Sequence, residues 1–378
     1  MIGIPSVIRA ANLQDLDALV AIENRAFATD RFSRRSFRYL LTKANAETLV
    51  EEHDGSVRGY ATLLFNVGTS LARLYSLAID PDFQGKGIGH DLITAAEKVA
   101  METNCITLRL EIRKDNIPSI SFFEKHGYKQ FDVLEDYYED HMEGLRYEKS
   151  LGPQQKPELM RVPYYEQTLD FTCGPAALMM AMKAIDRNIN LDRKLELRIW
   201  RESTTIFMTS GHGGCGPYGM ALAAYHRGFD VEIYVNDERA LFIDSVRNAE
   251  KKEVMRLVQE DFIEEVNRLS IKINYRALGL DEMYEKFDKG GVPIVLISSY
   301  RIYHEKFPHW VVVTGYDDRY IYVHDPFVDD EAGKTSTDCI DMPILSADFQ
   351  RMARYGKAGQ KAVLILKPRR GKRGKPHH

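Results

Sequence analysis

Cysteine is scarce in this sequence: only four cysteines are spread over 378 residues. So few thiols, placed far apart, exclude a disulfide-stapled scaffold and favour a reducing compartment. The sequence also has no uninterrupted apolar run approaching the roughly 20 residues of a membrane helix. Residues 1–7 lack the basic and apolar regions of a signal peptide. We therefore expect a cytoplasmic protein without a membrane partner.

An excess of charge of one sign is missing too, because 51 Lys and Arg against 55 Asp and Glu leave a formal net charge of -4. This balance gives no strong signal for nucleic acid as a partner of the whole chain. The local exception is the basic, Gly- and Pro-rich stretch at residues 367–378. We expect a disordered tail there, with a weak RNA or ribosome contact as the alternative.

What the chain does have is enough apolar sequence for two cores, with 44% hydrophobic and 28% charged residues. Helical and strand patterns alternate over residues 1–150, which indicates a mixed α/β domain. The helices are expected at 15–27, 91–102 and 118–126, and the strands at 47–52, 58–64, 73–79 and 107–112.

Residues 151–160 are polar, carry two prolines and break every pattern, so we expect a linker there. A second domain is expected over residues 161–366. Its patterns predict a helix starting near residue 173, a charged helix at 249–269, and strands at 292–298, 310–315 and 320–324.

A glycine-rich turn at residues 84–89 (Gln-Gly-Lys-Gly-Ile-Gly) joins the strand at 73–79 to a helix. Glycines let successive amides face one anion, and the helix N-terminus adds unpaired donors and partial positive charge. This arrangement suits a diphosphate, although a turn that only reverses the chain has the same pattern. The glycine spacing differs from those of P-loops and dinucleotide-binding folds.

With its flanking elements, this turn resembles the acetyl-CoA signature of the GNAT acyltransferase superfamily, over about residues 6–150. The segments Leu-Glu-Ile-Arg at 110–113 and Phe-Phe-Glu-Lys-His-Gly-Tyr at 122–128 are most similar to ribosomal-protein alanine N-acetyltransferases. The resemblance implies acetyl-CoA as the cofactor and Glu111 as the group that helps to deprotonate the incoming amine, with a surface ion-pair role as the alternative. The coenzyme-binding residues that it implies are Leu77, Ala78, Ile79, Gln84, Gly85, Lys86, Gly87, Ile88, Gly89 and Asn116.

The sequence departs from this family at Phe123, where a tyrosine commonly protonates the leaving thiolate. Tyr128, Tyr137 or Tyr138 is a possible replacement. Otherwise the thiolate leaves unassisted, the domain has changed its substrate, or acetyl-CoA is only a sensed ligand.

A second group of reactive residues lies after residue 160. Cys173 opens an apolar helix, whose dipole favours the thiolate, and Gln167 stands six positions before it, where its amide can help to hold an oxyanion. His309 begins one expected strand and Asp325 ends the next. If these strands pair as a hairpin in which partner numbers sum to 636, His309 faces residue 327 and lies diagonal to Asp325. The sequence therefore predicts a His–Asp pair, although each residue alone suits a structural role.

The Gly-His-Gly-Gly-Cys-Gly-Pro segment at 211–217 offers Cys215 as a rival nucleophile. His212 and Cys215 are too few ligands for a metal site, so no metal is expected. We favour Cys173, because only it has the upstream glutamine and the longer apolar helix.

Gln167, Cys173, His309 and Asp325 together resemble the papain-like peptidases that remove double-glycine leaders from bacteriocins, over about residues 160–330. The resemblance implies a papain-like α+β domain in which these residues are the oxyanion glutamine, nucleophile, base and orienting acid. Residues 186–290 are longer than this family suggests, and no transporter segment follows. We expect a bifunctional enzyme acting on peptide or protein substrates, with a non-catalytic peptide-binding module as the alternative for the second domain.

Overall fold

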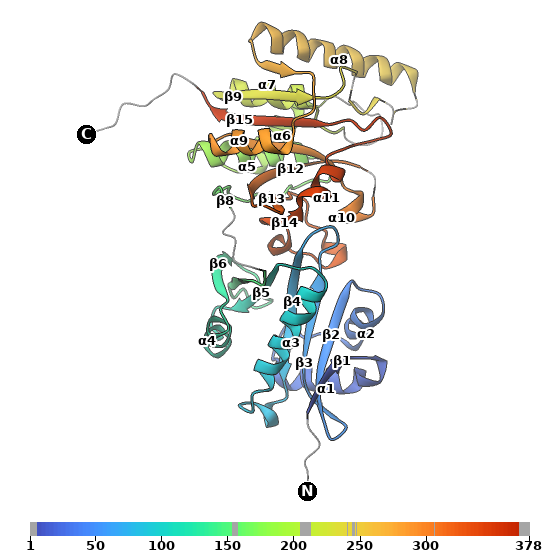
Figure 1. The fold of residues 1–378 in the computed structure, drawn as a ribbon, viewed down its shortest axis with the longest axis vertical. Coiled ribbons are helices and arrows are strands. Elements are labelled where there is room, and N and C mark those ends of the chain that lie inside the picture. The colour runs from blue at the N-terminus through green and yellow to red at the C-terminus, as the bar shows by residue number, and fades with distance from the viewer. Residues whose placement is uncertain are drawn as a thin grey trace, which may run out of the picture. The chain divides into compact units, whose positions relative to one another are not determined.

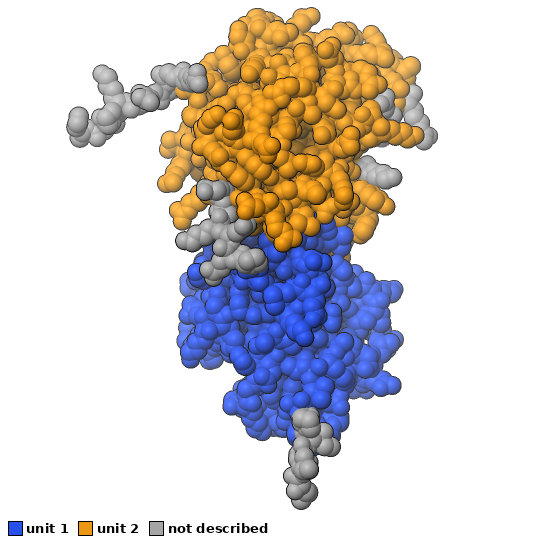
Figure 2. Space-filling view, viewed as in Figure 1, with its two compact units in different colours: residues 1–155 blue, residues 156–378 orange. Residues whose placement is uncertain are grey.

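The computed structural model describes residues 6–152, 158–204, 213–239, 241–243, 246, 248–305 and 307–369. The chain divides into two compact units, residues 1–155 and residues 156–378 (Figure 2). Each unit has its own sheet and its own hydrophobic cores. Within the described residues, no helix combines the length and the apolar composition that crossing a bilayer requires.

The first unit contains a seven-stranded sheet in the order β1-β2-β3-β4-β5-β7-β6 (Figure 1). Its neighbouring strands are antiparallel except for the parallel pair β4–β5. The strands are β1 Val7–Ala10, β2 Ala46–His53, β3 Ser56–Phe65, β4 Leu71–Ile79, β5 Thr107–Arg113, β6 Lys129–Leu134 and β7 Gly144–Ser150. The helices are α1 Leu16–Ala26, α2 Arg34–Thr42, α3 Ile88–Glu102 and α4 Ile117–Lys125. The expected mixed α/β order is confirmed.

Helices cover both faces of this sheet, because the strand residues alternate between two apolar cores. Leu63 and Leu74 lie in one core with Leu92 of α3. Val50 and Tyr60 lie in the other core with Leu19 of α1. Each fully buried leucine stabilises the fold by about 1.5–3 kcal/mol, so the two cores fix α1 and α3 on opposite faces.

The second unit contains an eight-stranded sheet in the order β10-β9-β15-β11-β12-β13-β14, with β8 paired to β12. The strands are β8 Glu158–Leu159, β9 Phe229–Val235, β10 Lys272–Asn274, β11 Val292–Ser298, β12 Pro308–Tyr316, β13 Tyr320–His324, β14 Met342–Leu345 and β15 Ala362–Pro368. The helices are α5 Cys173–Ile185, α6 Arg193–Ser203, α7 Pro217–His226, α8 Ala249–Arg268, α9 Leu280–Asp288, α10 Tyr300–Tyr303 and α11 Ser346–Met352.

This sheet also has two covered faces. On β11, Ile294 and Leu296 belong to the core that contains α5 and α7. Val295 and Ile297 point the other way, into the core that contains residues of α9 and α11. The uninterrupted apolar run of β11 follows from this two-sided burial.

Two expected boundaries differ in the structure. Part of the expected linker belongs to the second sheet, because Glu158–Leu159 form β8 and the Met160 amide donates to the Thr314 carbonyl at 2.8 Å. At the other end, β15 includes Lys367 and Pro368, which pair with Asp230 and Phe229, so the strand runs into the expected tail. Residues 153–157 and 370–378 of these two segments lie outside the described residues.

Candidate active sites

The thiol of Cys173 lies at the first residue of α5, as the sequence predicts. The side chain is partly exposed, whereas Ala176 to Met182 behind it are fully buried. Gly174 permits this packing, because a Cβ there would lie 3.0 Å from Met220 Sδ and 3.2 Å from Trp310 Cδ1. The helix start is therefore packed against β12, and the Cys173 sulfur lies at the positive end of the helix dipole.

His309 and Asp325 form the pair that the hairpin arithmetic predicts. His309 Nε2 and Asp325 Oδ1 are 2.5 Å apart, and both side chains are buried. Val312 pairs with His324 and Val313 with Val323, so partner numbers sum to 636 at this end of the hairpin. A bulge between Val313 and Gly315 shifts the register only toward the turn.

Asp325 is held from several sides. The Phe327 amide donates to its Oδ1 at 2.9 Å, and the Tyr303 hydroxyl donates to its Oδ2 at 2.7 Å. The Tyr164 hydroxyl donates to its backbone carbonyl at 3.0 Å. Because each carboxylate oxygen has a donor, a buried charge is tolerated at this position.

The protonation states follow from this packing. Burial opposes a charge on His309, but the Asp325 carboxylate and the contact with the Cys173 thiol overcome it, and the pKa of His309 rises to about 10. Burial likewise opposes the Asp325 charge, but the neighbouring His309 lowers the pKa of Asp325 below its usual value. The Nε2 atom is engaged with Asp325, so Nδ1 is the nitrogen left for the sulfur. The arrangement favours an imidazolium beside Cys173.

Gln167 lies on the loop before α5 and is fixed at its backbone, where its amide donates to the Pro326 carbonyl at 2.8 Å. Its side-chain Nε2 donates to the Leu169 carbonyl at 2.9 Å. The side-chain oxygen is buried and has no hydrogen-bond partner among the described residues. One N–H of the side-chain amide remains for a further acceptor.

No sequence pattern singles out Glu196, a fully buried carboxylate of α6 that organises the loop before Cys173. Its Oε1 accepts from the Thr168 amide at 2.8 Å and from the Thr172 hydroxyl at 2.5 Å. Its Oε2 accepts from the Thr168 hydroxyl at 2.6 Å and from the Tyr165 hydroxyl at 3.0 Å. Four donors on one carboxylate therefore position the segment that carries Gln167 and Cys173.

The rival thiol, Cys215, is buried at 3% exposure, and its backbone carbonyl accepts from Trp310 Nε1 at 3.0 Å. Burial, together with the charge of Cys173, raises its pKa well above the usual value. A buried, protonated thiol is a poor nucleophile. His212, which was considered together with Cys215 as a metal ligand, lies outside the described residues.

In the first unit, the glycine-rich turn leads directly into α3, whose N-cap is Gly87. Gly85 and Gly87 have φ angles of +74° and +85°, and a Cβ on either would meet no atom within 4 Å. The backbone of the turn is therefore open on this side, and it ends at the first amides of α3, which have no partner within the helix. The nearby Lys86 ammonium lies 4.7 Å from the centre of the Phe83 ring. These features fit a diphosphate.

The strand before this turn has an open edge. The β4–β5 pairing covers only Leu71 to Arg73 opposite Thr107 to Arg109. Beyond Arg73, β4 remains paired with β3 on its other side, as Leu77 with Ala61 and Ala78 with Tyr60 show. Backbone groups of residues 77–79 that point away from β3 therefore suit an extended amide-bearing ligand. Asn116 follows β5 as the N-cap of α4, and its Oδ1 accepts from the Ser119 amide at 3.2 Å.

Glu111 is on β5, and its side chain is 6% exposed. Its Oε2 accepts from Arg73 Nε at 2.9 Å, while Oε1 has no hydrogen-bond partner in the described structure. Arg73 Nη2 in turn donates to the Tyr137 hydroxyl at 3.1 Å. A carboxylate, a guanidinium and a phenol are thus connected beside the β4–β5 opening.

The three tyrosines considered as replacements for Phe123 differ in position. Phe123 itself is buried and packs edge-on against Phe122 and Tyr128. Tyr128 is also buried, and its hydroxyl donates to Glu97 at 3.0 Å, so it belongs to the core. Tyr138 is partly buried, and burial raises its pKa. The Tyr137 hydroxyl accepts a hydrogen bond from Arg73, the partner of Glu111.

Comparison with known proteins agrees with this division of the chain. The model of the Peptidase_C39 like family matches residues 162–367, which is more than half of the 378 residues. The chain belongs to the Peptidase_C39 like family. The match covers Gln167, Cys173, His309 and Asp325, so the four residues that meet around the Cys173 loop all lie within the family's own domain.

The model of the Acetyltransferase (GNAT) family matches residues 15–128. A putative ribosomal protein bS18 alanine N-acetyltransferase of Bacillus subtilis is 30% identical over 139 residues, covering 36% of this chain and 90% of that relative. The Salmonella typhimurium ribosomal protein bS18 alanine N-acetyltransferase is 29% identical, covering 35% and 87%. The crystal structure of the Escherichia coli ribosomal-protein-S18-alanine N-acetyltransferase matches with 22% identity and a TM-score of 0.37, covering 40% and 97%. The first unit is an N-acetyltransferase domain of the GNAT family.

Proposed function

We propose that the chain is a bifunctional enzyme, in which the GNAT domain acetylates an amine of a peptide or protein and the C39-like domain hydrolyses a peptide or amide bond. The buried His309–Asp325 pair, at 2.5 Å and in contact with the thiol at the start of α5, carries the second half of this proposal. A peptide-binding module has no need of a buried charge pair at its groove, because such a pair costs desolvation energy.

For the hydrolase, the chemistry starts from the Cys173 thiolate beside protonated His309. The sulfur attacks the carbonyl carbon, and the oxyanion is held by the Cys173 amide and the remaining N–H of Gln167. His309 gives its proton to the leaving amine, and the carbon–nitrogen bond breaks. Water, deprotonated by His309, then releases the acid from Cys173 and restores the thiolate. Asp325 keeps the ring in place throughout.

For the acetyltransferase, bound acetyl-CoA would supply an acetyl thioester. The turn at residues 84–89 would hold its pyrophosphate, and the open edge at residues 77–79 would hold the pantetheine arm. Glu111 would accept a proton from the acceptor amine, directly or through water, and Asn116 would contact the coenzyme. Tyr137, connected to Glu111 through Arg73, is the phenol that we assign to protonating the departing thiolate. Because the similar Bacillus subtilis and Salmonella typhimurium proteins bear the name of ribosomal protein bS18 alanine N-acetyltransferases, we propose an α-amine as the acceptor.

The test is mass spectrometry of a peptide library treated with the whole protein, with and without acetyl-CoA. We expect acetyl mass gains that need acetyl-CoA and cleavages that do not. Cys173→Ala should abolish only the cleavages, and Glu111→Gln should reduce only the mass gains. Cys105→Ala, which removes a buried thiol of the first unit, is the control for thiol loss.

Cleavage that persists in Cys173→Ala would refute the hydrolase half. Peptide binding without any cleavage would identify the second domain as the binding module instead. Tight acetyl-CoA binding with no acetylated product would leave the first domain as a sensor of the coenzyme.

A further inference from the structure

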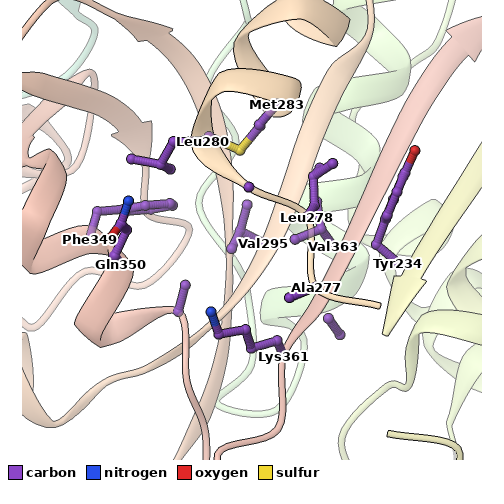
Figure 3. Close-up of a pocket in the computed structure, with 13 residues that line it drawn as sticks. Tyr234, Ala277, Leu278, Leu280, Met283, Val295, Phe349, Gln350, Lys361 and Val363 are labelled. Carbon is purple, nitrogen blue, oxygen red and sulfur yellow. The ribbon is translucent and has the colours of Figure 1, made fainter. Parts of the chain in front are cut away.

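A cavity of about 270 Å³ lies in the second unit, between the sheet and two helices (Figure 3). Its walls belong to the sheet face that carries α9 and α11, opposite the face that carries α5 and Cys173. Strands β9, β11 and β15 supply one wall, through Tyr234, Val295 and Val363. Helices α9 and α11 supply the other, through Leu280, Met283 and Phe349.

This space is open to solvent beside Ala277, Gly279 and Gln350, which are exposed. Its floor is formed by buried side chains, among them Met283 and Phe349, so a ligand that enters it is surrounded by apolar surface. An engineered cavity of about 150 Å³ with apolar walls stays dry and holds a benzene molecule. The present cavity has nearly twice that volume. It has room for an aliphatic chain of roughly eight carbons.

One end of the cavity is polar. Figure 3 shows Met283 and Leu280 at one end and Lys361 at the other. An adjoining hollow of about 290 Å³ shares Gln350 and Lys361 with the cavity and adds Arg351 and Arg354. Three cations and no carboxylate line this hollow, so the apolar space opens beside a concentration of positive charge.

Two of these three cations are uncompensated. Arg351 pairs with Asp348 at 3.1 Å, but Arg354 and Lys361 have no ion-pair partner within the described ranges. The carboxylates next to Tyr234 are already neutralised, Glu232 by Lys286 at 2.7 Å and Glu282 by Arg276 at 2.7 Å. The local excess charge therefore favours an anion at the mouth of the cavity.

We propose that this cavity binds an aliphatic monocarboxylate, with its chain between β15 and α11 and its carboxylate on Arg354 and Lys361. The Gln350 amide supplies a further donor at the junction of chain and head group. The site is separate from the proposed hydrolase site and would remain if that activity were absent. A ligand of this site needs two features: an apolar chain that fills the cavity, and one negative charge at the end of that chain.

The test is calorimetric titration of the full-length protein with sodium octanoate. We expect octanoate to bind, and octanol, octylammonium and acetate to bind at least about tenfold more weakly, because each lacks the charge or the chain. Arg354→Gln and Lys361→Gln should each weaken octanoate binding about tenfold. Lys357→Gln removes an exposed cation of the same loop that lines neither hollow, so it should change nothing.

A second measurement locates the ligand. In protein labelled with ¹³C-methyl methionine, the Met283 methyl signal, assigned with Met283→Leu, should shift on octanoate addition. No binding up to about 10 mM octanoate would overturn the proposal. So would equal binding of octanol, an unmoved Met283 signal, or an effect of Lys357→Gln equal to that of Lys361→Gln.

Discussion

The hydroxyl of Tyr303 donates a hydrogen bond to Oδ2 of Asp325 at 2.7 Å, on the carboxylate oxygen that His309 leaves unused. Tyr303 belongs to the short helix α10, between the two strands β11 and β12. A neutral donor here satisfies the buried carboxylate without competing for its charge. Tyr303 is therefore a positioning residue for the proposed site, acting through Asp325.

Removing this hydroxyl should loosen Asp325 while keeping the ring that packs against His309. We expect Tyr303→Phe to lower kcat of the proposed hydrolysis about tenfold and to lower the free energy of unfolding by about 1–3 kcal/mol. Peptide cleavage assays and urea denaturation measure the two effects. An unchanged kcat together with lowered stability would assign Tyr303 a purely structural role.

The imidazolium of His309 should activate Cys173 below neutral pH. At pH 6 we expect iodoacetamide to alkylate Cys173 at least about tenfold faster in the wild type than in His309→Gln, because the positive ring stabilises the thiolate. Mass spectrometry of the labelled tryptic peptide measures the rate. Cys215 in the same digest is the internal control, since it is buried and should stay unlabelled. Equal rates in both proteins would refute the ion pair.

The His309–Asp325 pair should also make stability depend on pH. The pKa of His309 in the folded protein is raised to about 10, above the roughly 6.5 of an unfolded histidine. Its contribution is fully present below the unfolded pKa and is lost as pH rises through about 10. The difference in unfolding free energy between wild type and Asp325→Asn should therefore shrink from pH 7 to pH 10 in urea titrations.

The surface carboxylate Asp348 provides the control for this pH series. It pairs with Arg301 at 2.9 Å. Carboxyl and guanidinium groups in general titrate outside the interval from pH 7 to pH 10. The difference between wild type and Asp348→Asn should stay constant over that interval. A parallel decline for both variants would indicate a general effect of alkaline pH rather than the titration of His309.

Glu196 should determine the order of the loop before α5. In Glu196→Gln one oxygen becomes an amide that cannot accept hydrogen bonds, so two of the four donors lose their acceptor. We expect a loss of about 1–3 kcal/mol in unfolding free energy and faster hydrogen exchange of the Thr168 amide. Glu202→Gln on the same helix is the matched control, since Glu202 forms a surface ion pair with Arg227. Unchanged exchange at Thr168 would contradict the assigned role.

The Tyr137 hydroxyl should matter for acetyl transfer and the Tyr128 hydroxyl should not. We expect Tyr137→Phe to lower kcat at least about tenfold at unchanged KM for acetyl-CoA, because it removes a proton donor and no coenzyme contact. Tyr128→Phe breaks the buried bond to Glu97 and should lower stability by about 1 kcal/mol at unchanged kcat. A thiol-release assay of acetyl-CoA turnover measures both. Equal kcat for Tyr137→Phe and wild type would mean that the thiolate leaves unassisted.

The sequence alone indicated the local features well. Both the turn at residues 84–89 and the helix start at Cys173 depend on residues that are adjacent in the chain. Hairpin pairing is also regular, so the expected register predicted that His309 and Asp325 lie close together. Tyr303 and Glu196 follow from no such rule, because they reach the site from α10 and α6 through packing between separate elements. The open edge of β4 was expected only from the family resemblance. The separation of β4 from β5 produces no periodic pattern of apolar residues in the sequence.

The boundaries failed for a related reason. Residues 158–159 look like a polar linker, yet they add a two-residue strand beside β12, where the backbone supplies all of the pairing. Lys367 looks like the start of a basic tail, yet its ammonium reaches Glu232 on the neighbouring strand. Side-chain composition is a poor guide where main-chain hydrogen bonds and a single distant carboxylate decide the fold.

The bulge between Val313 and Gly315 has a consequence for variation within this hairpin. It absorbs one extra residue on the turn side, while the pairs from Val313 toward His309 keep their spacing. A change of register at the tip, around residues 317–319, therefore need not move the imidazole of His309 away from its acid. The opposite end of the same two strands is held in one register, because Val312 and Val313 pair directly with His324 and Val323.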